Sequence, residues 1–93
     1  MPDARVVIAE QSEWLRRLLA TGLRDHGFDV SSARAGDEAL EQVRSLAPDC
    51  IVCGSRIEGR DGYWFVEQVR AEASAVARTP VLFLGDLDDE PAR

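Results

Sequence analysis

The most restrictive feature of the sequence is a strict alternation between short apolar runs and longer segments of helical periodicity. Four runs read as strands: RVVIA (5–9), DVSSA (29–33), CIVC (50–53) and VLFL (81–84). The segments between them carry apolar residues three and four positions apart, as on one face of an amphipathic helix. Strands that alternate with helices through short connections favour right-handed crossovers and a parallel sheet. We therefore expect an α/β fold with a doubly wound parallel sheet.

Turn-forming and capping residues set the expected helix ends. Ser12 is a suitable N-cap for the first helix, which Gly27 ends. The second helix is expected from Gly36 to the residue before Pro48, and the third over residues 62–76. The run at 29–33 is the most polar of the four, which is typical of a strand near a sheet edge.

Length and charge narrow the functional classes. The 93 residues fit one domain, 1–93, of which 87–93 is expected to be a frayed tail or the start of a further helix. The formal net charge is -6, which disfavours direct binding to nucleic acid or to anionic membranes. No apolar stretch approaches about 18 residues and no signal peptide is recognisable, so a cytoplasmic protein is expected.

Cys50 and Cys53 are the only cysteines, and their spacing imitates a metal or redox motif. On a strand, however, residues three positions apart point to opposite faces. We therefore predict two core thiols rather than a disulfide or a metal site.

Several motifs in a fixed order resemble the receiver domain of bacterial two-component response regulators. They are HGFDV followed by AGDEAL, then PD before the third strand, then GRDG before the third helix. The resemblance runs from Arg5 to about Asp86 and implies a flavodoxin-like fold with strand order 2-1-3-4 in this chain. Receivers carry a further helix, strand and helix, so the resemblance also implies that the last strand and helix are missing from this chain.

The resemblance implies a phosphorylation site that is degenerate here. In the family, two acidic residues after the first strand bind magnesium, an aspartate ending the third strand accepts the phosphoryl group, and a hydroxyl residue ends the fourth. Those positions hold Glu10 and Gln11, Gly54, and Gly85 in this chain. The family's lysine has no counterpart, because all 11 basic residues are arginines.

The chemistry of these replacements points away from catalysis. Aspartyl phosphorylation needs a carboxylate nucleophile, and Gly54 has no side chain. Glu10 beside the neutral Gln11 would hold magnesium weakly at best, so no metal or other cofactor is expected. We interpret the chain as a non-enzymatic pseudo-receiver that binds protein partners in a signalling assembly without phosphorylation.

Two other functions stay open. The cleft left by Gly54 and Gly85 could bind a small ligand or a divalent cation, with help from the acidic tail that begins at Asp86. Alternatively, the chain could be phosphorylated at a nonstandard acceptor such as Asp61 or Asp86.

Possible interaction residues lie between the third strand and the third helix. Tyr63 and Trp64 are residue types that dominate interface hot spots, although the Trp64 ring could instead fold over the helix edge. Arg56 and Arg60 belong to a mixed-charge loop that could hold a partner carboxylate or be simply solvated. With the last strand absent, the strand at 81–84 becomes an edge, and a homodimer could form there or on an uncovered helix face.

Overall fold

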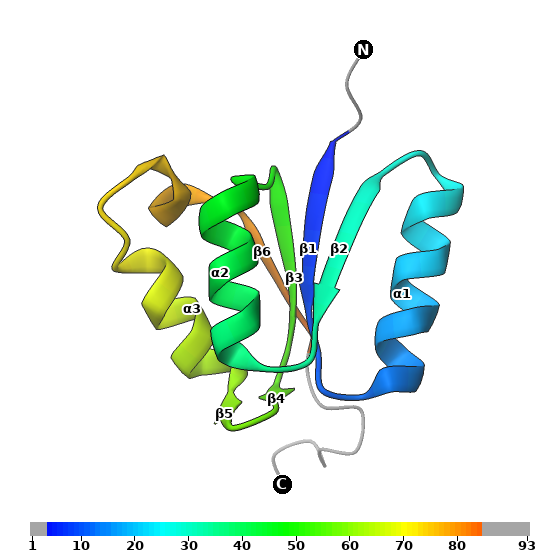
Figure 1. Ribbon diagram of the computed structural model, residues 1–93, viewed down its shortest axis with the longest axis horizontal. Helices are drawn as coiled ribbons and strands as arrows, with labels where there is room; N and C mark the ends of the chain where they lie inside the picture. The colour runs from blue at the N-terminus through cyan, green and yellow to red at the C-terminus, as the bar shows by residue number, and fades with distance from the viewer. Residues whose placement is uncertain (1–3, 85–93) are drawn as a thin grey trace, which may run out of the picture.

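The computed structural model describes residues 4–84 and contains a central parallel sheet (Figure 1). Its strands are β1 (Arg5–Ala9), β2 (Asp29–Ala33), β3 (Cys50–Gly54) and β6 (Val81–Leu84). They lie side by side in the order β2-β1-β3-β6, and every neighbouring pair is parallel. This confirms the predicted order 2-1-3-4, because β6 is the fourth of the apolar runs. Gly85 and the predicted 87–93 tail lie outside the described residues.

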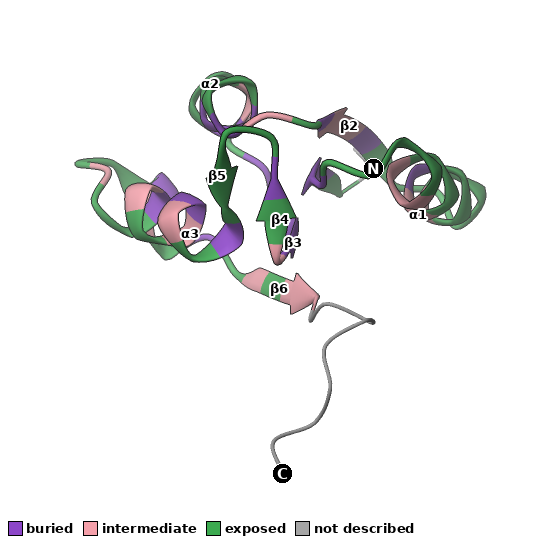
Figure 2. Cartoon of the chain, turned by 90° about the horizontal axis from the view of Figure 1, so that it is seen from below, coloured by how far each residue is buried: buried purple, intermediate pink, exposed green. Residues whose placement is uncertain are grey.

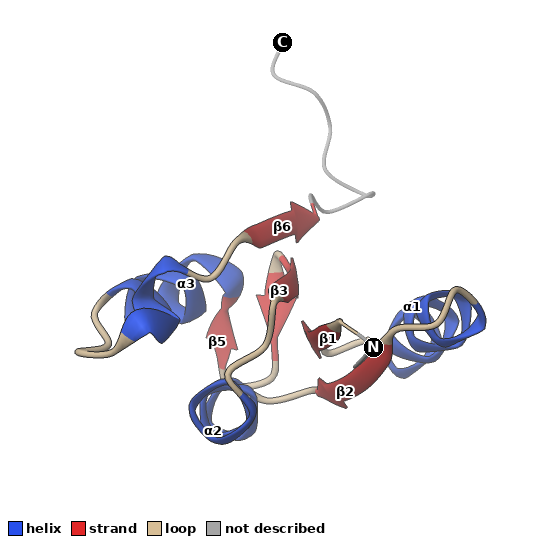
Figure 3. Ribbon diagram, turned by 90° about the horizontal axis from the view of Figure 1, so that it is seen from above, coloured by secondary structure: helices blue, strands red, loops and turns tan. Residues whose placement is uncertain are grey.

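The helices form two layers around the sheet. They are α1 (Glu13–Asp25), α2 (Gly36–Leu46) and α3 (Gly62–Arg70), followed by the short 3₁₀ helix η1 (Ala75–Arg78). Seen along the strands, α1 covers one face of the sheet while α2 and α3 cover the other (Figure 3). The doubly wound α/β fold predicted from the sequence is therefore confirmed.

Local capping contacts fix the ends of the first two helices. The Ser12 hydroxyl oxygen accepts a hydrogen bond from the Leu15 N–H at 3.3 Å, which satisfies one free donor of the first turn of α1. Gly27 follows α1 with φ of 90°, a conformation that favours glycine. At the end of α2, Ala47 takes the left-handed conformation and its N–H donates to the Val43 carbonyl.

The prediction for the third helix was wrong at its C-terminal end. The helix stops at Arg70 rather than Val76, and Ser74 begins the separate 3₁₀ turn η1. The Ser74 hydroxyl accepts from the Val76 N–H at 3.3 Å, because serine hydrogen-bonds to nearby backbone more readily than it continues a helix. The Arg70 guanidinium then donates to the Thr79 carbonyl at 2.8 Å and ties this turn to α3.

The segment expected to be a mixed-charge loop contains a small antiparallel hairpin. Its strands are β4 (Arg56–Ile57) and β5 (Arg60–Asp61). Gly59 makes the turn with φ of 86°, and the Ile57 side chain is 2% exposed and belongs to the core. One buried apolar residue within a polar stretch therefore anchors this hairpin to the body of the domain.

The core consists of two apolar clusters, one on each side of the sheet. The larger cluster lies under α2 and α3 and includes Val7, Ile51, Cys53 and Phe65, whereas the smaller lies under α1 and includes Ile8 and Val52. Cys50 and Cys53 are both free, and Cys53 is buried. Cys53 is therefore a core thiol, as predicted, whereas Cys50 is only partly buried and belongs to neither cluster.

The surface keeps some apolar side chains exposed. On α1, Trp14 is 70% exposed and Leu18 is 54% exposed, whereas Leu19 and Leu23 pack against the smaller core cluster. In Figure 2, β6 shows intermediate and exposed residues, and its Leu82 is 57% exposed. No helix within residues 4–84 has the length and apolar character that a membrane span requires.

Candidate functional site

The parallel register brings the predicted site residues together at one edge of the sheet. Ala9 is level with Cys53 across the β1–β3 pair, so Glu10, which follows β1, lies beside Gly54, which ends β3. This edge is where ligands bind in open α/β sheets. Glu10 and Gly54 are thus neighbours at this edge of the sheet.

Glu10 is a buried carboxylate held by backbone contacts. Its residue is 6% exposed, and Oε2 accepts a hydrogen bond from the Ser12 N–H at 2.8 Å. Its own N–H donates to the Ala33 carbonyl at 3.0 Å, and Nη1 of Arg16 donates to its carbonyl at 3.0 Å. The residue is therefore fixed both through its backbone and through its side chain.

The carboxylate of Glu10 occupies the space directly over Gly54. A Cβ atom placed on Gly54 would overlap Oε1 of Glu10 and lie 2.9 Å from its Cδ. Such contacts are closer than packed atoms tolerate, so position 54 cannot carry a side chain while Glu10 stays in place. Sequence reasoning missed this contact, because nothing in the pattern tells which way the Glu10 side chain turns.

Gln11 contributes no charge to this edge. It is exposed, and its N–H donates to the Arg56 carbonyl at 3.2 Å. Within the described residues, no three His, Cys, Asp or Glu side chains gather in a way that could hold a metal ion. Gly85 and the acidic residues from Asp86 onward lie outside the described part, so their predicted roles stay predictions.

Cys53 lies immediately before Gly54 and is electrostatically coupled to Glu10. Burial is the main cause that raises the pKa of the Cys53 thiol to about 12, and the nearby negative charge of Glu10 is the smaller cause. Its Sγ lies 3.3 Å from the Gly54 carbonyl oxygen, to which the S–H donates. Because the thiolate is the reactive form, this cysteine is chemically inert at neutral pH.

The comparisons with known proteins agree with this architecture. Residues 6–93 match the family described as "Response regulator receiver domain". The chain belongs to the response regulator receiver family. Its resemblance to receivers, inferred above from short motifs, is therefore confirmed over nearly its whole length.

Solved receiver structures share the fold of this receiver domain. A putative response regulator from Chloroflexus aurantiacus superposes with a TM-score of 0.84 at 28% identity, over 94% of this chain and 70% of that one. The chemotaxis response regulator CheY4 of Vibrio cholerae gives a TM-score of 0.81 at 28% identity, over 87% of this chain and 67% of that one.

Curated relatives are longer proteins with different overall activities. The chain is 29% identical over 89 residues to the probable transcriptional regulator ycf27 of Porphyridium aerugineum, covering 96% of this chain and 35% of that protein. It is 34% identical over 89 residues to a protein-glutamate methylesterase/protein-glutamine glutaminase of Haloarcula marismortui, covering 95% of this chain and 23% of that protein. The receiver domain therefore spans about a quarter to a third of these relatives.

The β4–β5 hairpin is tied to the segment that follows β2. The Glu58 N–H donates to the Arg34 carbonyl at 2.7 Å, and the two side chains form an ion pair at 3.2 Å. Asp61 caps α3, since its Oδ1 accepts from the Trp64 N–H at 2.8 Å. The carboxylate proposed as a nonstandard phosphoryl acceptor is thus engaged as a helix cap.

Trp64 makes its principal contacts inside the domain. It packs against the larger core cluster and over Gly36, where an added Cβ would lie 2.7 Å from its Cζ3. The Arg60 guanidinium lies 4.8 Å from the centre of the indole ring, within range of a cation–π contact. The structure therefore shows the ring folded over the helix edge, and Arg60 stacked on it.

Tyr63 points the other way and is 68% exposed. Its ring centre lies 4.7 Å from that of Phe83 on β6, in a tilted arrangement. The two rings help to line a groove of about 630 Å³ between α3 and β6, together with Val66, Glu67, Arg70 and Val81. Among the predicted interaction residues of the hairpin and α3, Tyr63 is the aromatic side chain presented to the outside.

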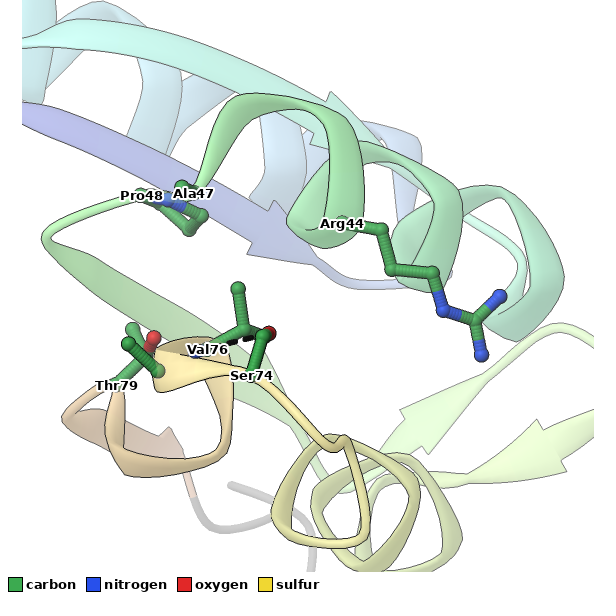
Figure 4. Close-up of a pocket in the computed structure, with 7 residues that line it drawn as sticks. Arg44, Ala47, Pro48, Ser74, Val76 and Thr79 are labelled. Atoms are coloured by element: carbon green, nitrogen blue, oxygen red, sulfur yellow. Dashed lines mark hydrogen bonds between the residues drawn. The ribbon is translucent and has the colours of Figure 1, made fainter.

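A second hollow of about 370 Å³ lies at the opposite end of the sheet (Figure 4). Pro48, Val76 and Thr79 are among its lining residues, near the starts of β3 and β6. Arg44 also lines it, but the guanidinium donates twice to the Glu72 carboxylate, at 3.1 and 3.0 Å. Its charge is therefore already matched, and the hollow lies away from Glu10 and Gly54.

Proposed function

We propose that this receiver domain is a non-enzymatic protein-interaction module that acts without phosphorylation. The observation that carries the proposal is Gly54, which ends β3 with no side chain and is covered by the Glu10 carboxylate. Phosphoryl transfer to a receiver needs a carboxylate nucleophile and a bound cation that offsets the incoming charge. The neutral Gln11 beside Glu10 further supports an inactive site.

The partner is a protein of a signalling or regulatory assembly. Tyr63, with Phe83 behind it, offers an exposed aromatic surface of the kind that anchors protein interfaces. Glu67 and Arg70 border the same groove and supply charges of both signs for orientation. The regulators and methylesterases among the relatives are consistent with a role in controlling an attached or associated protein.

Beryllofluoride or acetyl phosphate with magnesium tests the proposal. The amide NMR spectrum of the chain is expected to stay unchanged, because no acceptor carboxylate ends β3. A receiver that retains its aspartate serves as the positive control for the reagents. Local shifts at Glu10 and Gly54 would contradict the proposal, whereas shifts centred on Asp61 or Asp86 would favour a nonstandard acceptor.

A further inference from the structure

We propose that Glu10 acts as an internal plug of the receiver site, with its carboxylate seated where the side chain of residue 54 would project. The plug deepens the proposed function and rests on it, since it describes how an inactive site is filled. Gly54 then has a positive structural role, because only a residue without a side chain leaves room for the plug.

The strand register positions the backbone of Glu10, and a hydrogen bond positions its carboxylate. The β1–β3 register places Glu10 one residue beyond the Ala9–Cys53 pair, so its side chain starts at the level of Gly54. At the other end, Oε2 accepts from the Ser12 N–H at 2.8 Å, while Oε1 lies over Gly54. Any side chain at position 54 would compete with Glu10 for the same volume.

A hydrogen bond offsets part of the cost of burying the Glu10 carboxylate. A buried carboxylate is unfavourable unless hydrogen bonds or opposite charges compensate it. The Ser12 N–H supplies one such bond, and the Arg16 guanidinium holds the adjacent backbone through the Glu10 and Gln11 carbonyls at 3.0 and 3.4 Å.

The Glu10 carboxylate itself blocks access to the end of β3. A phosphoryl group that approaches the end of β3 meets a carboxylate already in place and must displace it. The lack of an acceptor side chain and the presence of the Glu10 carboxylate are therefore two separate barriers to phosphorylation at position 54. Replacing Gly54 alone removes only the first of them.

A double-mutant cycle on the whole chain tests the plug, with Gly54→Ala, Glu10→Ala and the double variant compared by urea unfolding. Gly54→Ala is expected to lower the unfolding midpoint of the parent chain, because the new methyl group expels Glu10. In the Glu10→Ala background, the same change is expected to leave the midpoint unchanged or raise it, since alanine restricts the unfolded chain more than glycine. Equal lowering in both backgrounds, or no lowering in the parent, overturns the plug.

The Ser12 amide proton gives a second, direct readout. Loss of its bond to Glu10 is expected to move this resonance in Gly54→Ala in the same direction as in Glu10→Ala. Gly22→Ala is the matched control, because a Cβ at this exposed position on α1 meets no atom within 4 Å and leaves Ser12 unaffected. An unmoved Ser12 resonance in Gly54→Ala overturns the plug. Neither measurement uses a phosphoryl donor, so this failure is distinct from failure of the proposed function.

Discussion

Gly62 lies so close to the carbonyl oxygen of Gly54 that a Cβ at position 62 would overlap that oxygen. The same Cβ would lie 2.9 Å from Cε1 of Phe83 and 3.2 Å from Sγ of Cys53. Because the first atom belongs to the backbone, the conflict is not relieved by a side-chain rotation. The start of α3 therefore packs directly on the end of β3.

Gly62→Ala is accordingly expected to lower the free energy of unfolding by about 2 kcal/mol or more, as overpacking in a close-packed core does. Urea unfolding measures the change through its midpoint and slope. Gly22→Ala is the control, because Gly22 is exposed to solvent and lies within α1, away from its ends. This substitution is expected to raise the free energy of unfolding by about 0.5–1 kcal/mol. Equal midpoints for the two variants would show that the β3–α3 contact is looser than described.

Truncation of Trp64 is expected to lower the free energy of unfolding more than truncation of Tyr63. Trp64→Ala removes a ring that covers Gly36 and packs on the core, so a loss of about 2 kcal/mol is expected. Tyr63→Ala removes a largely exposed ring and its contact with Phe83, so a loss below about 1 kcal/mol is expected. Thermal unfolding of both variants measures the difference, and a larger loss for Tyr63→Ala would reverse the two assignments.

Cys53 is expected to resist alkylation at pH 8 in the folded protein, whereas the partly exposed Cys50 reacts. With a pKa of about 12, only about one Cys53 thiol in ten thousand is ionised at that pH. Mass mapping of the alkylated peptides measures this selectivity. Modification of Cys53 at the rate seen for Cys50 would show that the site opens readily.

The same thiol makes stability depend on pH in the alkaline range. Its pKa is raised from 9.0 in the unfolded reference to about 12 in the folded chain. Folding therefore favours the protonated form, and its contribution is complete below pH 9 and is lost as pH rises toward 12. Cys53→Ala is expected to reduce the fall in unfolding midpoint over this window, and identical curves for parent and variant would contradict the assignment.

Gly54→Asp by itself is not expected to create a phosphorylatable receiver. The new carboxylate must displace Glu10, and Gln11 and Gly85 still lack the acid and hydroxyl that the family uses. Acetyl phosphate labelling followed by mass spectrometry measures the outcome. An acyl phosphate at residue 54 would refute the expectation.

Magnesium alone is expected to produce no saturable shift at Glu10 in an amide NMR titration. The ion needs a nearly complete set of oxygen ligands, and Glu10 is beside a neutral Gln11. Saturable movement centred on Asp86 would instead favour the cation-binding alternative. Calcium, which accepts more irregular ligand sets, serves as the comparison ion.

Much of the fold followed from local pattern. The central strands β1 and β3 begin and end close to their apolar runs, because burial on both faces requires continuous apolar residues. The Ser12 cap and the turn at Gly27 were likewise predictable, since each depends on one residue's own chemistry. The end of α3 was not predictable in this way, because periodicity continued to Val76 while Ser74 and Arg70 built a separate turn.

The sequence by itself determined which residues follow or end the strands at this edge of the sheet. The glycine that ends the third strand and the glutamine after Glu10 can be read without coordinates. The tertiary structure decided which of these residues lie together. Glu10 and Gly54 are far apart along the chain, and only the β1–β3 register brings the carboxylate over the glycine. The sequence specifies which side chains are available, whereas the packing of the strands decides which of them come into contact.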